Sequence, residues 1–300
     1  MSADGRYLYL SSILPRKVAR LSLPSMKLDL EIDLGKPTWI APQLPEIDVT
    51  MFAGSVAVDA LNSRRFAVSM LSSMYPVLQG LRVYEDATVV AEIRWKVDSM
   101  FGDVVAFDGV GKLVTARSAT TPDTVARLRI EGANIVEVDS LRVGSAQNGG
   151  GSASISLSSQ AFLTAGGSKV ELPGFTYRGQ LPPLTFLNQG DPFPLIKGCV
   201  FANNEGTVAA CFSQWDADAR LPTFRTFVLY ELSGANPFLV VGLDQTVGPV
   251  SEIVRFGPGQ FAVSVGVDAT ESGVQLEPFS YLSQNKRIYF LSGIDTTYRP

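Results

Sequence analysis

The sequence predicts an all-β fold, a single β-propeller built from four-stranded antiparallel blades. A turn followed by a short apolar strand recurs along the chain, at residues 4–10, 62–68, 109–115, 204–210 and 257–263, with a weaker copy at 158–163. Consecutive copies lie roughly 45 to 60 residues apart, which is the spacing of propeller blades. A sustained helical apolar pattern is lacking, whereas runs such as 27–34 alternate apolar and polar residues as half-buried strands do.

Each repeat is expected to supply strands a, b, c and d, counted from the propeller axis outward. The recurring phrases are the b strands. The a strands are expected at 47–52, 103–107, 153–157, 198–202 and 252–256. The c strands are expected at 18–23, 81–85, 125–130, 169–172, 226–232 and 287–291. The d strands are expected at 28–34, 88–95, 135–143, 175–181 and 238–243.

The strand count predicts how the ring closes. It gives b, c and d at the start, four full blades, and then a, b and c at the end, all within one domain over residues 1–300. Propellers commonly close by sharing a sheet between the two chain ends, which hides exposed strand edges. We therefore expect six blades. A seven-bladed ring, or one truncated at its N-terminus, is the alternative.

Composition excludes several classes of function. Apolar residues make up 46% of the chain and charged residues 18%, which suggests extensive burial between sheets. The net charge of −4 and the lack of a Lys or Arg run argue against nucleic acid. We find no apolar segment long enough for membrane insertion and no visible signal peptide. The chain has no histidine, which removes the usual general base and the commonest metal ligand.

Three segments carry a family resemblance. Residues 2–10 (Ser-Ala-Asp-Gly-Arg-Tyr-Leu-Tyr-Leu), 18–25 and 253–257 resemble bacterial YVTN/NHL-type propellers, which are WD40-like and occur in secreted or cell-surface proteins. The resemblance implies a propeller fold and an extracytoplasmic location. Of two readings, a segment cut from a longer secreted protein and a complete cytosolic chain, we favour the first. An extra blade usually precedes the Asp-Gly-Arg-Tyr-Leu-Tyr phrase in that group, which keeps both blade counts open.

Loop lengths indicate one face as the binding surface. The a–b and c–d connections are mostly tight, whereas the b–c and d–a connections are long, at 35–45, 72–79, 145–151, 182–197, 214–224 and 267–285. Loops longer than the fold requires are often functional, although drift in a tolerant family is the alternative. Large aromatic residues in these loops, Trp39, Tyr75, Trp215 and Tyr281, are the candidate binding residues. They could instead fold back and cover the loops.

A metal site is the alternative hypothesis. Related propellers include lactonase-type hydrolases that hold a divalent metal such as Ca²⁺ or Mg²⁺ in a central funnel. Asp48, Asp103 and Glu252 lie near the predicted starts of a strands, where such a metal would bind. These carboxylates could equally cap strands or pair with arginines. The acids of 214–218 resemble half of a calcium loop but lack its glycine and distal glutamate.

The two cysteines predict a disulfide. Cys199 and Cys211 fall on predicted strands a and b of one hairpin, which can bring them face to face. A bond would fit an oxidising compartment, and two buried free thiols are the alternative.

The function expected from the sequence is a non-catalytic, extracytoplasmic module that presents its long loops to a protein or glycan and needs no cofactor. The alternatives are the metal-dependent hydrolase and a structural spacer in a larger surface protein. The oligomeric state is left open.

Overall fold

The structure, a computed structural model, describes residues 2, 4–12, 16–36, 51–72, 78–94, 104–107, 111–117, 124–143, 155–157, 161–164, 166–172, 174–182, 195–203, 205–214, 225–243, 250–257, 259–266 and 286–296. These residues form strands, turns and irregular segments, and none of them is helical, so the all-β prediction is confirmed. No helix among them is long and apolar enough to span a membrane. The chain divides into two compact units, residues 1–119 with 123–142 and residues 120–122 with 143–300. The single domain over residues 1–300 stays a prediction.

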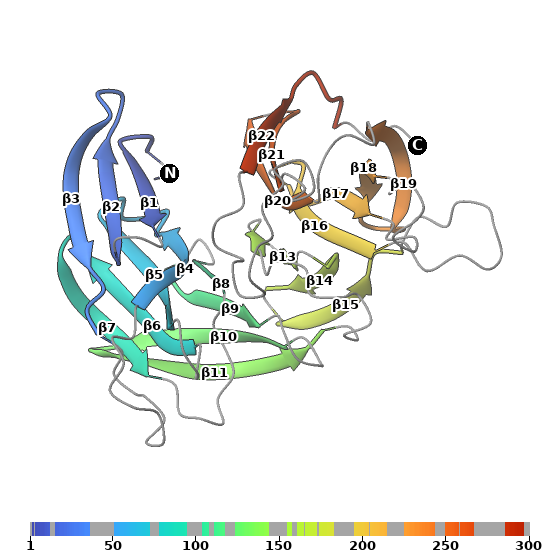
Figure 1. Cartoon of the computed structure of the whole chain (residues 1–300). Coiled ribbons are helices and arrows are strands. Elements are labelled where there is room, and N and C mark those ends of the chain that lie inside the picture. Colours follow the sequence, from blue (N-terminus) through green and yellow to red (C-terminus); the bar gives the residue numbers. More distant parts are fainter. Residues whose placement is uncertain are drawn as a thin grey trace, which may run out of the picture. The chain divides into compact units, whose positions relative to one another are not determined.

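The first unit contains three groups of antiparallel strands (Figure 1). The first group is β1 (Tyr7–Ser12), β2 (Lys17–Ser22) and β3 (Lys27–Asp33). The second is β4 (Met51–Val58), β5 (Arg65–Ser72), β6 (Leu78–Glu85) and β7 (Thr88–Arg94). The third is β8 (Val104–Phe107), β9 (Leu113–Arg117), β10 (Thr124–Glu131) and β11 (Asn134–Arg142). The inner strands lie next to one another, β1 against β4 and β4 against β8.

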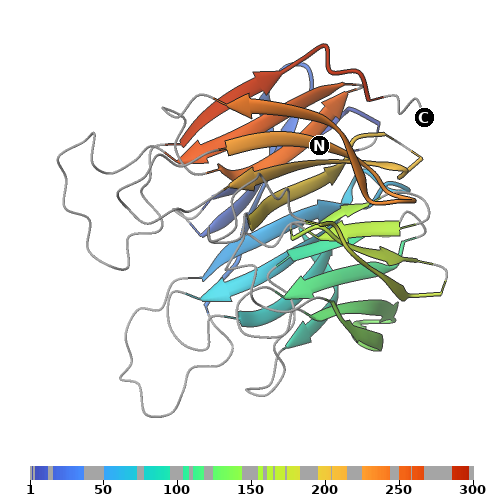
Figure 2. The same ribbon diagram turned by 90° about the vertical axis from the view of Figure 1, so that its right-hand side faces the viewer.

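The second unit repeats this arrangement, and its neighbouring strands lie side by side in both views (Figures 1 and 2). Its first sheet is β12 (Ile155–Leu157), β13 (Ala161–Thr164), β14 (Ser168–Glu171) and β15 (Thr176–Gln180). Its second is β16 (Leu195–Phe201), β17 (Val208–Gln214), β18 (Arg225–Glu231) and β19 (Asn236–Leu243). Its third is β20 (Val250–Gly257), β21 (Gln260–Gly266) and β22 (Lys286–Leu291). The inner strand β16 packs between β12 and β20.

Alternation along the strands explains where the core lies. On β2 and β3, Val18 pairs with Ile32, and both side chains are buried while the charged residues beside them stay partly or fully exposed. The buried faces of successive sheets form apolar clusters within each unit. Phe66 lies in one cluster and Leu128 in another in the first unit, and Phe227 and Tyr230 lie in two clusters of the second. The predicted half-buried periodicity therefore builds the core.

Two details differ from the sequence prediction. The a strand expected to end at residue 52 continues to Val58 in β4, because a bulge between Ala53 and Val56 carries the chain past a glycine and a serine that suggest a break. Residues 47–50 of the expected strand lie outside the described residues. The outer strands β7 and β11 also meet at one parallel pair, Glu92 with Asn134, so the second and third groups join into one eight-stranded sheet. The other pairings of the described strands are antiparallel.

Connections leave each sheet from two different ends. The a–b and c–d connections leave from one end, which we call the turn end, and span two to six residues. The b–c and d–a connections leave from the opposite end, the loop end, and include 34–50, 181–194 and 267–285. The long loop expected at 72–79 is shorter, at 73–77, because β5 and β6 extend into it. The number of blades stays a prediction.

Candidate functional site

Most residues that the sequence nominates for a site lie outside the described residues. These are Trp39, Tyr75, Trp215, Tyr281, Asp48 and Asp103. Glu252 is the third residue of β20 and pairs with Ser264 on β21. Within the described residues, no group of three His, Cys, Asp or Glu side chains could hold a metal ion. The aromatic binding residues and the metal site both stay hypotheses.

The structure joins Cys199 and Cys211 in the predicted disulfide. The two residues are directly opposite on β16 and β17, with their Cα atoms 4.2 Å apart. Both are fully buried in the cluster that contains Val228 and Tyr230. Burial in this apolar surrounding raises the pKa of the Tyr230 hydroxyl to about 12. The disulfide is thus part of the core of the second unit.

The loop end of the β4–β7 sheet contains a small recess. Half of its lining residues are apolar, and the other half are polar or charged. The apolar residues are Met51, Met70, Leu81 and Ile93, and the others are Gln79, Arg82, Glu92 and Arg94. Between Gln79 and Leu81, Gly80 lets β6 approach β7 closely, because a Cβ at this position would clash with the carbonyl oxygen of Ile93. The φ angle of 131° also favours glycine there. The recess has room for about one water molecule.

The charged side chains of the recess pair with one another. Glu92 accepts hydrogen bonds from Arg82 Nε at 3.3 Å and from Arg94 Nε at 3.0 Å. Arg82 also donates to the carbonyl oxygen of Leu34 at 3.2 Å, which fixes the start of the connection to β4. Arg94 is largely exposed, so one guanidinium group faces solvent at the loop end. Sequence reasoning missed this cluster, because no local pattern predicts which residues border a recess.

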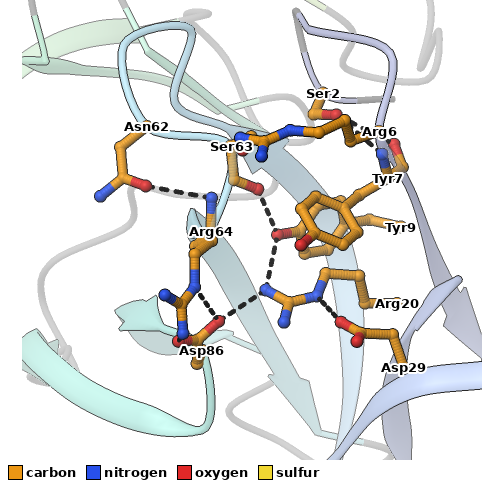
Figure 3. A network of polar contacts seen from close by, with 10 residues as sticks. All are labelled: Ser2, Arg6, Tyr7, Tyr9, Arg20, Asp29, Asn62, Ser63, Arg64 and Asp86. Carbon is orange, nitrogen blue, oxygen red and sulfur yellow. Dashed lines mark hydrogen bonds and ion pairs between the residues drawn. The ribbon is translucent and has the colours of Figure 1, made fainter. Parts of the chain in front are cut away.

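The turn end of the first two sheets carries a polar network that we call the latch (Figure 3). The members that carry its contacts are Ser2, Asp4, Arg6, Tyr7, Tyr9, Arg20, Asp29, Ser63, Arg64 and Asp86. Tyr9 on β1 donates its hydroxyl to the carbonyl oxygen of Ser63 at 2.7 Å, and Arg6 donates to Ser63 Oγ at 3.1 Å. The first sheet therefore holds the β4–β5 turn directly.

Arg20 is the centre of the latch. Its side chain is only 7% exposed and lies between two carboxylates, 2.6 Å from Asp29 and 2.8 Å from Asp86. The guanidinium also lies 4.5 Å from the centroid of the Tyr7 ring, within cation–π range. Burial alone would lower the pKa of Arg20, but hydrogen bonds to Tyr9, Asp86 and Asp29 raise it. A charge this well paired can stay buried in the folded protein.

Asp86 links the latch to solvent. Arg64 donates to both carboxylate oxygens of Asp86, through Nε at 2.9 Å and through Nη2. These hydrogen bonds, with those from Arg20, hold the pKa of Asp86 below its usual value despite the opposing effect of burial. The three arginines and three aspartates of the latch balance in charge and pair with each other. We therefore interpret the latch as a structural contact between the two sheets.

The lowered pKa of Asp86 predicts that acid weakens the stability contributed by the latch. The Asp86 carboxyl group binds a proton less tightly in the folded protein than in the unfolded chain. Its contribution to the free energy of unfolding is therefore complete above the unfolded pKa of about 3.9. It is lost as pH falls through the lower pKa of the folded state. We expect Asp86→Asn to flatten the fall in the free energy of unfolding below about pH 4, measured by urea unfolding. Glu137→Gln, at an exposed position of β11, is the control, and an equal effect of both variants would contradict the prediction.

Comparisons with known proteins bear on the fold. No protein-family model matches the sequence, and no curated protein matches it either. Among solved structures, a protein from Lactobacillus plantarum is 12% identical with a TM-score of 0.55, and the match covers 97% of this chain and 86% of that one. Luciferin-regenerating enzyme is 12% identical with a TM-score of 0.54, covering 97% and 89% of the two chains.

A third match is the dihydro-heme d1 dehydrogenase NirN, which is 15% identical with a TM-score of 0.51. It covers 90% of this chain, which spans about half (51%) of that one. These matched enzymes are β-propeller proteins. The fold of this chain is a β-propeller. Because propellers host unrelated activities, a fold shared with enzymes does not make this propeller an enzyme.

Proposed function

We propose that this propeller is a non-catalytic, extracytoplasmic binding module that presents its loop end to a protein or glycan. One observation carries the proposal. Connections of two to six residues close the turn end, whereas the loop end carries connections as long as 267–285. Long connections that a rigid scaffold holds at one end are where binding residues concentrate.

The described residues support this division between the two ends. At the turn end of the first unit, the charged side chains of the latch are used in contacts between two sheets. At the loop end, the β4–β7 sheet has a small recess of mixed apolar and polar lining, and one of its lining residues is the largely exposed Arg94. The aromatic residues Trp39, Trp215 and Tyr281 belong to the long connections, and Tyr75 belongs to the shorter connection 73–77 at the same end. These four residues are the proposed contacts.

The disulfide supports the proposed location. Cys199 and Cys211 are the only cysteines of the chain, and the structure pairs them. Such bonds persist mainly in oxidising compartments, which include the periplasm and the cell surface.

Binding to a glycan array tests the function, with a panel of purified extracellular proteins as a second set of probes. For the probe that binds, we expect Trp215→Ala or Tyr281→Ala to weaken affinity roughly 30-fold, as loss of an aromatic hot spot of about 2 kcal/mol does. Leu61→Ala is the matched control, because Leu61 is 71% exposed on the β4–β5 turn at the opposite end. Equal losses in all three variants would contradict binding at the loop end.

Thermal melting of the wild-type protein with added Ca²⁺ or Mg²⁺ tests the alternative of a metal-dependent hydrolase. A metal at about 100 times its Kd adds about 2.7 kcal/mol and raises the melting temperature visibly. We expect no rise. A rise that Asp48→Asn, Asp103→Asn or Glu252→Gln abolishes would replace the binding module with a metal-dependent enzyme.

A further inference from the structure

Charged pairs recur between the c and d strands of the sheets. In four of the five described sheet groups that have a d strand, a charged residue on d pairs with one on c. The pairs are Arg20 with Asp29, Arg82 with Glu92, Arg127 with Asp139, and Glu171 with Arg178. Charged side chains on outer strands keep these edges from pairing with other chains. By this criterion β3 and β15 are protected, whereas β7 and β11 meet each other at one parallel pair, Asn134 with Glu92.

The fifth outer strand, β19, lacks this protection. Its eight residues, Asn236–Leu243, include no charged side chain. Val240 and Val241 are 42% and 38% exposed. Because they are successive strand residues, they lie on opposite faces of the sheet, so the edge is apolar on both sides. Phe238 and Leu239 are half-buried against the core cluster of Phe227, which anchors the strand.

The backbone of β19 is also available for pairing. β19 is the outermost strand of its sheet, paired along one edge with β18 from Arg225 to Glu231. Among the described strands, none pairs with its other edge. Outer strands of this protein do pair with one another elsewhere. Glu92 on β7 donates its N–H to the carbonyl oxygen of Ala133 at 3.0 Å, where β7 meets β11.

We propose that β19 is a dimerisation edge, on which the β19 strands of two copies of this chain pair antiparallel. A two-fold symmetric pair requires a surface complementary to itself. The uncharged β19 meets this requirement, whereas two β3 strands paired about Leu30 would place Asp29 of one copy opposite Glu31 of the other. The pairing centres on the exposed valines, because Pro237 has no N–H to donate at the strand start. This inference is independent of the proposed function.

The mass of the full chain in solution tests the dimer. We expect sedimentation to show a concentration-dependent doubling from the 32.3 kDa of one chain, because a strand-sized interface is small and binds weakly. Val240→Lys is expected to keep the protein at the mass of one chain. Val138→Lys is the matched control, because Val138 is 45% exposed on β11, an outer strand that already carries charged residues. Thermal melting followed by circular dichroism confirms that both variants fold.

Amide hydrogen exchange distinguishes edge pairing from other contacts. Exchange of residues 238–243 is expected to slow as concentration rises and the dimer forms, and to stay fast in Val240→Lys. Wild-type protein that keeps the mass of one chain at every concentration overturns the proposal. A dimer that survives Val240→Lys, a dimer without slower exchange in 238–243, and open-ended aggregates each overturn it as well.

Discussion

Replacing Phe66 with alanine is expected to lower the free energy of unfolding by about 3–5 kcal/mol, the usual cost of removing a buried Phe side chain. Phe66 is fully buried on β5. Its ring lies 4.8 Å from the Tyr9 ring and 5.3 Å from the Tyr84 ring, so it joins β1 to β5 and β6. Each aromatic pair adds about 0.5–1.5 kcal/mol beyond the area it buries.

The loss should extend to the latch. Tyr9 contacts Phe66 through its ring and donates its hydroxyl to Ser63, so a cavity at position 66 removes the support of a latch residue. Urea unfolding followed by circular dichroism measures the loss as a lower midpoint with an unchanged slope. Phe66→Leu refills part of the cavity and should cost less. Leu61→Ala, at an exposed position, should change stability by less than about 0.5 kcal/mol. A loss in Phe66→Ala no larger than in Leu61→Ala would contradict the prediction.

Local patterns were sufficient to predict the strands. The alternation of 27–34 corresponds to β3, and the d strand expected at 88–95 corresponds to β7. A strand with one buried face has a two-residue period, which is visible without any knowledge of the tertiary structure. The a strand expected at 47–52 was ended too early for a related reason. Gly54 and Ser55 look like a strand end, but they lie in a bulge whose Ser55 hydroxyl accepts the N–H of Val105 on β8.

The latch could not be predicted in this way. Arg20 and Asp86 are 66 residues apart, on different sheets, and meet only because one sheet packs on the next. The one local signal is the position of Arg20 two residues from Val18, on the buried face of β2. The apolar edge of β19 is visible in its sequence only when it is compared with the charged outer strands of the other sheets. Both features depend on residues that are far apart in the sequence, so no single local motif predicts them.

Removing the disulfide is expected to lower the free energy of unfolding of the propeller by about 3 kcal/mol. Cys199 and Cys211 are 12 residues apart, and a bond that closes a loop of this size restricts the unfolded chain by about that amount. The loss is a large share of the 5–15 kcal/mol that stabilises an ordinary domain. Urea unfolding of Cys199→Ala/Cys211→Ala measures it, and we expect the larger effect in the second unit, where the bond lies.

Reduced wild-type protein is the matched control, because it keeps both sulfur atoms in the core and lacks only the bond. A reduced protein less stable than the oxidised one assigns the loss to the bond, and any further loss in the double alanine variant measures the packing of the sulfurs. Equal stability in both redox states would contradict the prediction. It would also mean that the folded protein does not depend on an oxidising compartment, which removes the main structural support for an extracytoplasmic location.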